Sequence, residues 1–176
     1  MLRRGTHFAG LLLAAWAMGL ELAHVLEWAP KASYPGTLYV RLQESLYAWF
    51  GIIASVIWVL AILASLALAV LSRHDRLTRV PLAAAAALEV TALIVFFAVV
   101  YPVNLRFPVH GPGTVPAGWA ALRDRWELGH AAGFALFTAA FVLLLTSALR
   151  PGDPPASRQR TAGTPASASR QPGASR

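Results

Sequence analysis

Four long apolar blocks constrain the fold of this chain more than any other feature of its sequence. The blocks cover about residues 7–28, 46–71, 80–101 and 128–149. A helix rises about 1.5 Å per residue, so roughly 20 apolar residues cross a hydrocarbon core about 30 Å thick. A helix also satisfies its own backbone hydrogen bonds in lipid. We therefore predict an all-α integral membrane bundle of four transmembrane helices, formed by residues 1–150.

The composition supports a membrane protein and excludes several kinds of site. Hydrophobic residues make up 57% of the 176 residues and charged residues only 13%, which is too few to cover the surface of a soluble domain. The sequence contains no cysteine, and this excludes disulfides, thiolate metal sites and cysteine catalysis. Any metal ligands must therefore be nitrogen or oxygen atoms.

Proline and glycine residues fall between the apolar blocks, where they begin or end helices. The residues that we interpret as breakers are Pro30, Pro35, Gly36, Pro102, Pro108, Pro112, Pro116 and Pro151, with Pro81 at a helix start. They leave two long loops at the same side, residues 29–45 and 102–126. Apolar residues at helical spacing predict that the second helix begins near Thr37, and that Pro116 opens the fourth helix.

The positive residues predict the orientation of the bundle. Ten of them lie on the side of the two termini: Arg3, Arg4, Arg73, Arg76, Arg79, Arg150, Arg158, Arg160, Arg170 and Arg176. Five lie on the other side: Lys31, Arg41, Arg106, Arg123 and Arg125. Because cytoplasmic loops of membrane proteins carry the excess of Lys and Arg, we expect both termini in the cytoplasm. We place the chain in the cell membrane, as a bacterial inner-membrane protein.

The net charge of +7 does not indicate nucleic-acid binding. The arginines lie at the ends of the apolar blocks and in the tail, and they do not form a basic face between aromatic residues. The lipid bilayer and a hydrophobic small molecule are the expected partners. Alanine-rich faces at 61–69 and 83–87 suit either a homo-oligomer interface or packing inside the monomer.

The two ends of the chain differ in character. Residues 151–176 consist mainly of small, polar and basic residues, so we predict a disordered basic tail that contacts anionic lipid head groups. Arg3 and Arg4 before a short apolar run and Ala15-Trp16-Ala17 are compatible with a cleaved signal peptide. The apolar stretch continues to Trp28, and this favours an uncleaved anchor.

Charged residues inside the apolar blocks are few and therefore informative. Glu21-x-x-His24 in the first block and Glu127-x-x-His130 at the start of the fourth each aim an acid and an imidazole at one point. A carboxylate placed there costs a few kcal/mol unless it is neutral, paired or bound to metal. The second helix adds Gln43, Glu44 and Tyr47 near that level, and the third adds Glu89.

Two interpretations of this polar set remain open. Two Glu-x-x-His pairs with carboxylates from two further helices are typical of di-iron and di-manganese bundles. In that case Glu21, His24, Glu127 and His130 hold iron, manganese or copper. In the other case no metal is bound: His24 bonds a neighbouring helix, Glu89 is protonated, and Glu127 pairs with Arg123 or Arg125.

Several motifs together resemble a known family. They are Ala23-His24-Val25-Leu26-Glu27 followed by Pro30-Lys31, then Gln43 and Tyr47, then Pro102-Val103-Asn104, and finally Trp119-x3-Arg123-x-Arg125-Trp126-Glu127-x-x-His130. In this order and spacing they resemble a family of small four-helix membrane proteins, mostly of unknown function, that includes the fungal anthrone oxygenases. The resemblance covers about residues 8–148 and is closer to uncharacterised bacterial members than to the fungal enzymes.

The resemblance implies a membrane-embedded oxidoreductase-like protein that acts on an aromatic or quinone-like small molecule. The carbon of an anthrone between two aryl rings is acidic enough for a protein base, which needs a partner that stabilises the enolate oxygen. For these roles the resemblance provides His130 or His24 as base, and Asn104 and Arg123 as oxygen-binding groups. The flat slot for the substrate then consists of Gln43, Tyr47, Trp119 and Trp126.

A non-catalytic role is the alternative. A helical membrane bundle with the same polar cluster binds a lipid or small molecule without converting it, or serves as a helper subunit of another protein. A transporter is less favoured, since no span is broken by Gly or Pro in the way that midplane transport sites are.

Overall fold

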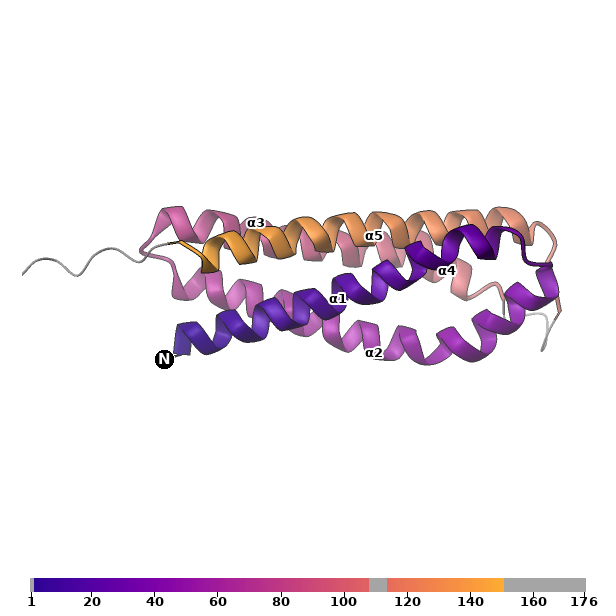
Figure 1. The fold of residues 1–176 in the computed structure, drawn as a ribbon, viewed down its shortest axis with the longest axis horizontal. Helices are drawn as coiled ribbons and strands as arrows, with labels where there is room; N and C mark the ends of the chain where they lie inside the picture. The colour runs from indigo at the N-terminus through magenta and orange to yellow at the C-terminus, as the bar shows by residue number, and fades with distance from the viewer. Residues whose placement is uncertain (1, 108–113, 151–176) are drawn as a thin grey trace, which may run out of the picture.

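The computed structural model describes residues 2–107 and 114–150, apart from the side chain of Ala48. Six helical elements follow one another: α1 (Leu2–Ala32), α2 (Gly36–Leu71), α3 (Arg76–Val95), the π-helix η1 (Phe96–Val100), α4 (Tyr101–Asn104) and α5 (Trp119–Ala148). In Figure 1, α3, η1 and α4 continue one another, so that the bundle consists of four long rods. The predicted tail 151–176 lies outside the described residues.

The four rods confirm the predicted transmembrane bundle. Each contains a helix long and apolar enough to cross a membrane, within Leu2–Ala32, Trp49–Leu71, Arg76–Asn104 and Trp119–Ala148. Figure 1 places the start of α1, the α2–α3 turn and the end of α5 at one end of the bundle, here called the termini end. The opposite end, the loop end, contains the α1–α2 turn and the start of α5.

The helices exceed the predicted spans, and three prolines stand inside the rods. We expected Pro30 and Pro102 to break the chain, but α1 continues to Ala32 and the third rod continues through Pro102 to Asn104. Pro81 lies inside α3 rather than at its start. All three are near the end of a rod, where a missing N–H removes a single hydrogen bond. The predicted start of the second helix, near Thr37, lies one residue from the observed Gly36.

Local capping explains where two helices begin. Asp75 precedes α3, and its carboxylate accepts hydrogen bonds from the backbone N–H groups of Leu77 and Thr78, at 3.1 and 3.2 Å. Hydrogen bonds from Thr78 hold the pKa of Asp75 below its usual range. Before α5, Gly118 adopts a φ of 72°, a left-handed conformation that favours glycine.

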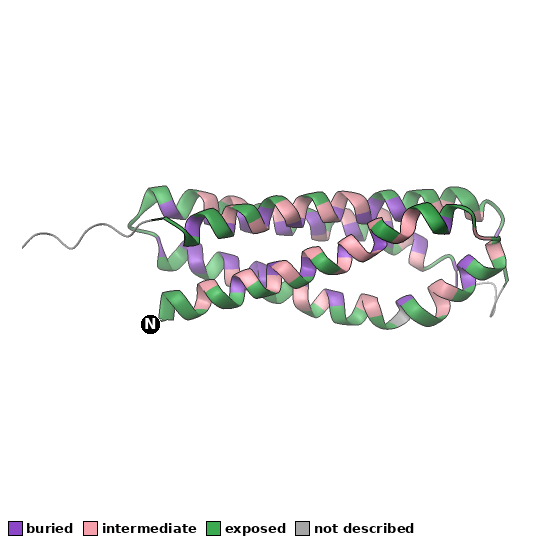
Figure 2. Ribbon diagram, viewed as in Figure 1, coloured by how far each residue is buried: buried purple, intermediate pink, exposed green. Residues whose placement is uncertain are grey.

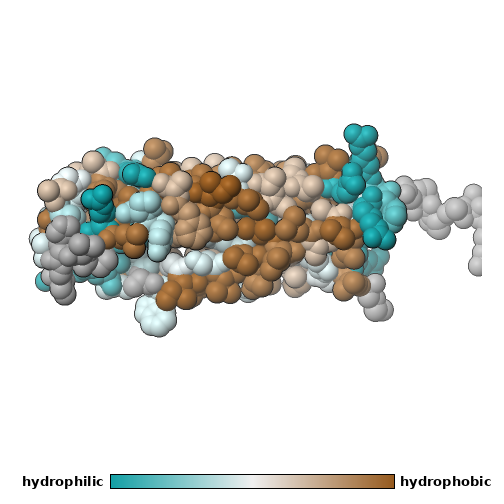
Figure 3. Space-filling model, turned by 180° about the vertical axis from the view of Figure 1, so that it is seen from behind, coloured by the Kyte–Doolittle hydropathy of each residue, from teal (hydrophilic) through white to brown (hydrophobic). Residues whose placement is uncertain are grey.

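Packing divides the interior into two apolar clusters. The cluster of the loop-end half is aromatic and includes Tyr39, Tyr47, Trp58, Phe96 and Trp126. The cluster of the termini-end half consists of small and aliphatic residues: Ala14, Leu68, Ala69, Leu82, Ala85, Ala140 and Leu144. Figure 2 shows exposed residues on the outward faces of all four rods, and Figure 3 shows that hydrophobic side chains cover the middle of the bundle. This surface fits a lipid environment.

The alanine-rich faces are divided between interior and surface. Ala61, Ala85 and Ala86 are buried inside the monomer, whereas Ala83 and Ala87 are exposed. Close helix packing inside the monomer therefore accounts for part of the alanine pattern, and a homo-oligomer stays a prediction.

Candidate functional site

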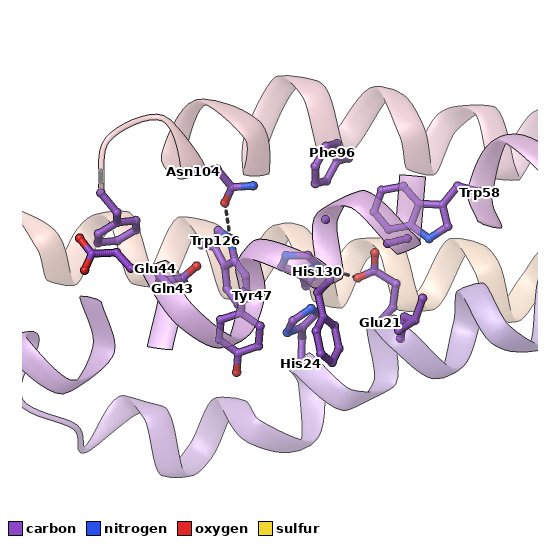
Figure 4. A pocket seen from close by; sticks show the side chains of 15 residues that line it. Glu21, His24, Gln43, Glu44, Tyr47, Trp58, Phe96, Asn104, Trp126 and His130 are labelled. Atoms are coloured by element: carbon purple, nitrogen blue, oxygen red, sulfur yellow. Dashed lines mark hydrogen bonds and ion pairs between the residues drawn. The ribbon is translucent and has the colours of Figure 1, made fainter. Parts of the chain in front are cut away.

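A cavity of about 650 Å³ lies in the loop-end half of the bundle, within the size range of small-molecule sites. All four rods contribute to its wall (Figure 4). Its lining residues are Leu20, Glu21, His24, Gln43, Glu44, Tyr47, Phe50, Gly51, Ala54, Trp58, Phe96, Asn104, Phe107, Trp126 and His130. Aromatic side chains therefore dominate a wall that carries few acids and imidazoles.

Glu21 and His130 form a buried pair across the interface between α1 and α5. Oε2 of Glu21 lies 2.8 Å from Nδ1 of His130, and the two residues are 3% and 6% exposed. Gly133, one turn after His130, makes room for the carboxylate, since a Cβ there would lie 2.9 Å from Cδ of Glu21. In the described part of the chain, Nε2 of His130 has no hydrogen-bond partner. An imidazole oriented by a carboxylate and free at its other nitrogen is the arrangement of a general base.

His24 packs against this pair rather than bonding to it. Its ring centroid lies 4.1 Å from that of His130, 4.8 Å from Trp126 and 5.0 Å from Tyr47. The two predicted base candidates therefore occupy one aromatic cage. Of the two, His130 is the one within hydrogen-bond distance of a carboxylate, and the role of either histidine as a base stays a prediction.

Asn104 is held in one orientation by Trp126. The indole Nε1–H of Trp126 donates to Oδ1 of Asn104 at 2.7 Å, and an indole nitrogen can only donate. The amide Nδ2 of Asn104 is consequently the group left to donate to a ligand, and Asn104 lines the cavity. The role of Asn104 in binding an oxygen atom stays a prediction.

Behind the aromatic wall lies a charged network that sequence reasoning missed. Lys31 is 2% exposed, and its Nζ lies 3.1 Å from Oε1 of Glu127 and 3.3 Å from Oε2 of Glu27. The Tyr39 hydroxyl donates to Glu127 at 3.4 Å, and the Tyr47 hydroxyl donates to Glu27. Burial, followed by the nearby Glu127 carboxylate, raises the pKa of Tyr39. The network ties α1, α2 and α5 together beside the cavity.

Lys31 was assigned to a loop because Pro30 was interpreted as the end of the helix. The signal that identifies its role is the spacing Glu27-x-x-x-Lys31, which brings the two side chains together only if the helix continues. Lys31 also lies over the rings of Tyr47 and Trp126, 4.8 and 4.7 Å from their centroids. The cation therefore supports the cavity wall from outside.

Of the four predicted metal ligands, Glu127 lies apart from the other three, which are Glu21, His24 and His130. The predicted arrangement was therefore wrong for Glu127, and metal binding stays a prediction. Glu127 lies one helical turn before His130 and faces Lys31 and Tyr39 rather than Glu21. Within residues 2–107 and 114–150, no group of three or more acids and imidazoles is placed to hold a metal ion. Glu89, the predicted acid of the third helix, is fully buried near Ser65 and does not line the cavity.

Arg123 and Trp119 also lie outside the cavity wall, which corrects their predicted roles. Nη1 of Arg123 donates to the carbonyl of Ala32 at 3.0 Å, so this residue caps the end of α1. The ring of Trp119 packs against Gly36, where a Cβ would lie 2.9 Å from the indole. Both residues hold the start of α5 against the α1–α2 turn at the loop end of the bundle.

The remaining predicted residues are brought together. His24, Gln43, Tyr47, Asn104, Trp126 and His130, with Glu21 and Glu44, all line the same cavity. Sequence reasoning missed the rest of the wall, for which the signal is a stripe along α2. Tyr47, Gly51, Ala54 and Trp58 recur at spacings of three and four residues, which places them on one helical face.

Comparisons with known proteins give no family for this chain. No protein-family model, no curated protein and no solved structure matches it. The resemblance to the family of the anthrone oxygenases therefore stays a prediction from the motifs.

Proposed function

We propose that this protein is a membrane-embedded oxidoreductase that removes a proton from a carbon atom of a flat aromatic ketone, in the manner of an anthrone oxygenase. The observation that carries the proposal is the Glu21–His130 pair: His130 lines an aromatic cavity, and within the described residues its buried Nε2 has no hydrogen-bond partner. A carbon acid needs this combination, because the base must be oriented and the carbanion must be shielded from water.

In the first step Nε2 of His130 takes a proton from the methylene carbon of the anthrone. Glu21 stabilises the resulting imidazolium through Nδ1. The electron pair left on carbon delocalises to the ketone oxygen, where Nδ2 of Asn104 donates a hydrogen bond to the enolate. Each residue used in this step lines the cavity.

Dioxygen is the oxidant in the second step. The carbanion transfers its electrons to dioxygen, a carbon–oxygen bond forms, and the terminal peroxide oxygen receives a proton from the His130 imidazolium. Loss of the second methylene proton then breaks the oxygen–oxygen bond, which releases water and leaves a second carbonyl group. One anthrone and one dioxygen thus give one quinone and one water.

The arginine distribution supports a location for the site. Arg3, Arg4, Arg73, Arg76 and Arg79 are exposed at the termini end, opposite the cavity. Membrane proteins carry an excess of positive residues on the cytoplasmic side, so the termini end faces the cytoplasm. The cavity, at the other end, then lies in the outer half of a cell membrane. A lipid-soluble aromatic ketone reaches such a depth by partitioning into the bilayer.

The proposal is tested by turnover of anthrone under air with protein purified in mild detergent. His130→Gln is expected to lower turnover about 100-fold or more while anthrone binding stays within threefold, as for loss of a general base. The control is His74→Gln, because His74 is exposed in the α2–α3 turn far from the cavity. Full turnover by His130→Gln contradicts the proposal. Binding of anthrone without any turnover by the unaltered protein identifies the non-catalytic alternative.

A further inference from the structure

Pro102 removes the usual hydrogen-bond donor of one backbone carbonyl in the third rod. It stands inside the rod, within the candidate membrane span Arg76–Asn104. In an α-helix the carbonyl of Ala98 accepts a bond from the N–H of residue 102, and proline has no N–H. The π-helix η1 precedes the proline, with the N–H of Tyr101 bonded to the carbonyl of Phe96, so this part of the rod is wound more widely than an α-helix. A carbonyl without a donor is unfavourable inside a membrane span.

Arg125 of α5 supplies a donor to this carbonyl. Its Nη2 donates to the carbonyl oxygen of Ala98 at 2.8 Å. Because the guanidinium is charged, the bond is stronger than one between neutral groups. Both residues are exposed, so the bond lies on the surface of the bundle, outside the cavity. Arg125 therefore bonds the backbone of the third rod, whereas Glu127, its partner in one sequence interpretation, contacts Lys31.

The next residue of α5, Trp126, bonds the same rod on the other side of the proline. Its indole N–H donates to Oδ1 of Asn104 at 2.7 Å. The two rods are also in close contact here, since a Cβ on Gly129, one turn further along α5, would lie 2.5 Å from Val100. Two adjacent residues of α5 thus hold the third rod before and after Pro102.

We propose that Arg125 is a positioning residue, which fixes the last turn of the third rod by bonding the Ala98 carbonyl and so places the Asn104 amide in the cavity wall. Asn104 ends α4, two residues after Pro102, and lines the cavity. Without the Arg125 bond the last turn shifts against α5, and the bond between Trp126 and Asn104 lengthens. The inference rests on the proposed function for its effect on turnover, because there Asn104 donates to the ketone oxygen.

The test follows the indole N–H of Trp126 by nuclear magnetic resonance in detergent micelles, without any ligand. The signal is assigned by its loss in Trp126→Phe. Arg125→Met is expected to shift it toward the position of an indole without a hydrogen bond. The same variant is expected to lower kcat for anthrone about 10-fold or more, with a smaller change in KM, as for a misplaced catalytic group. Arg41→Met is the matched control, since Arg41 is exposed and does not line the cavity.

Pro102→Ala provides a rescue that a merely structural role of Arg125 would not show. Alanine restores an N–H at residue 102, so the Ala98 carbonyl no longer depends on Arg125. Arg125→Met in the Pro102→Ala background is therefore expected to leave the Trp126 signal and the thermal stability as they are in Pro102→Ala alone. If Arg125→Met by itself does not fold, this double variant is still expected to fold.

Two outcomes overturn the inference. One is an unchanged Trp126 signal in Arg125→Met. The other is a double variant that does not fold although Pro102→Ala folds. Absence of anthrone turnover by the unaltered protein overturns the proposed function instead, and the indole signal then decides the role of Arg125 without it.

Discussion

Nδ1 of His130 lies 2.8 Å from Oε2 of Glu21, and this contact joins α5 to α1 at the deep end of the cavity. A carboxylate at Nδ1 places the ring proton on that nitrogen and leaves Nε2 as the acceptor. The contact depends on Gly133. Glycine is the only residue type without a Cβ, and a Cβ at this position would leave no room for the Glu21 carboxyl group. Orientation of the base and packing of the two helices are thus one structural feature.

Glu21→Gln is expected to lower the rate of anthrone turnover about 100-fold with little change in anthrone binding. The amide can still accept a hydrogen bond from Nδ1, but it lacks the charge that stabilises the His130 imidazolium. Steady-state kinetics that separate kcat from KM check this prediction. A fall in binding with an unchanged kcat would contradict it.

Two glycines of α5 are expected to respond differently to alanine. In Gly133→Ala the new Cβ meets the end of the flexible Glu21 side chain at 2.9 Å, so the carboxylate moves away from His130 and turnover falls while the fold is kept. In Gly129→Ala the Cβ lies 2.5 Å from Val100 of η1, which lies in a packed interface. We therefore expect lower thermal stability for Gly129→Ala than for Gly133→Ala, measured on both proteins in the same detergent.

Gly51→Leu is expected to fill the cavity and to abolish binding of anthrone. Gly51 lines the cavity, and no atom lies within 4 Å of a Cβ placed on it, so the larger side chain enters free space without disturbing the fold. Gly19→Leu is the matched control because Gly19 is exposed and has equal space, but does not line the cavity. Unchanged anthrone binding by Gly51→Leu, measured by calorimetry, would place the ligand elsewhere.

Lys31→Met is expected to destabilise the bundle by about 3 to 5 kcal/mol, because it leaves the buried Glu127 carboxylate without its cation. The double variant Lys31→Met with Glu127→Gln removes both charges and is expected to recover most of the loss. Unfolding in a series of detergent mixtures measures both. Equal stabilities of Lys31→Met and the unaltered protein would show that the ion pair contributes nothing.

Acidification is expected to loosen the start of α3. The pKa of Asp75 is held below its ordinary value of 3.8 in the folded protein, so the cap stabilises the helix above that pH and is lost as the pH falls through the lower folded value. Hydrogen exchange at the amides of Leu77 and Thr78, corrected for the intrinsic pH dependence, checks this. Asp75→Ala is expected to show at neutral pH the exchange that the unaltered protein reaches only in acid.

The candidate site shows where sequence patterns stop being informative. Glu-x-x-His spacing correctly indicated that Glu21, His24 and His130 meet, because i and i+3 side chains share a helical face. The same rule gave the wrong place for Glu127, which faces Lys31 rather than the cavity. The spacing of residues along one helix does not determine how that helix is rotated about its axis relative to its neighbours. This rotation decides which side chains of neighbouring helices are in contact.

The amino-acid sequence alone determined that the chain forms four membrane-crossing helices. Hydrocarbon thickness and backbone hydrogen bonding leave no other structure for apolar blocks of this length. Only the tertiary structure decided which polar side chains share a cavity, and it revealed the buried Lys31. Contacts between helices depend on the close packing of particular side chains, such as Glu21 against Gly133. Such packing cannot be predicted from a local sequence pattern.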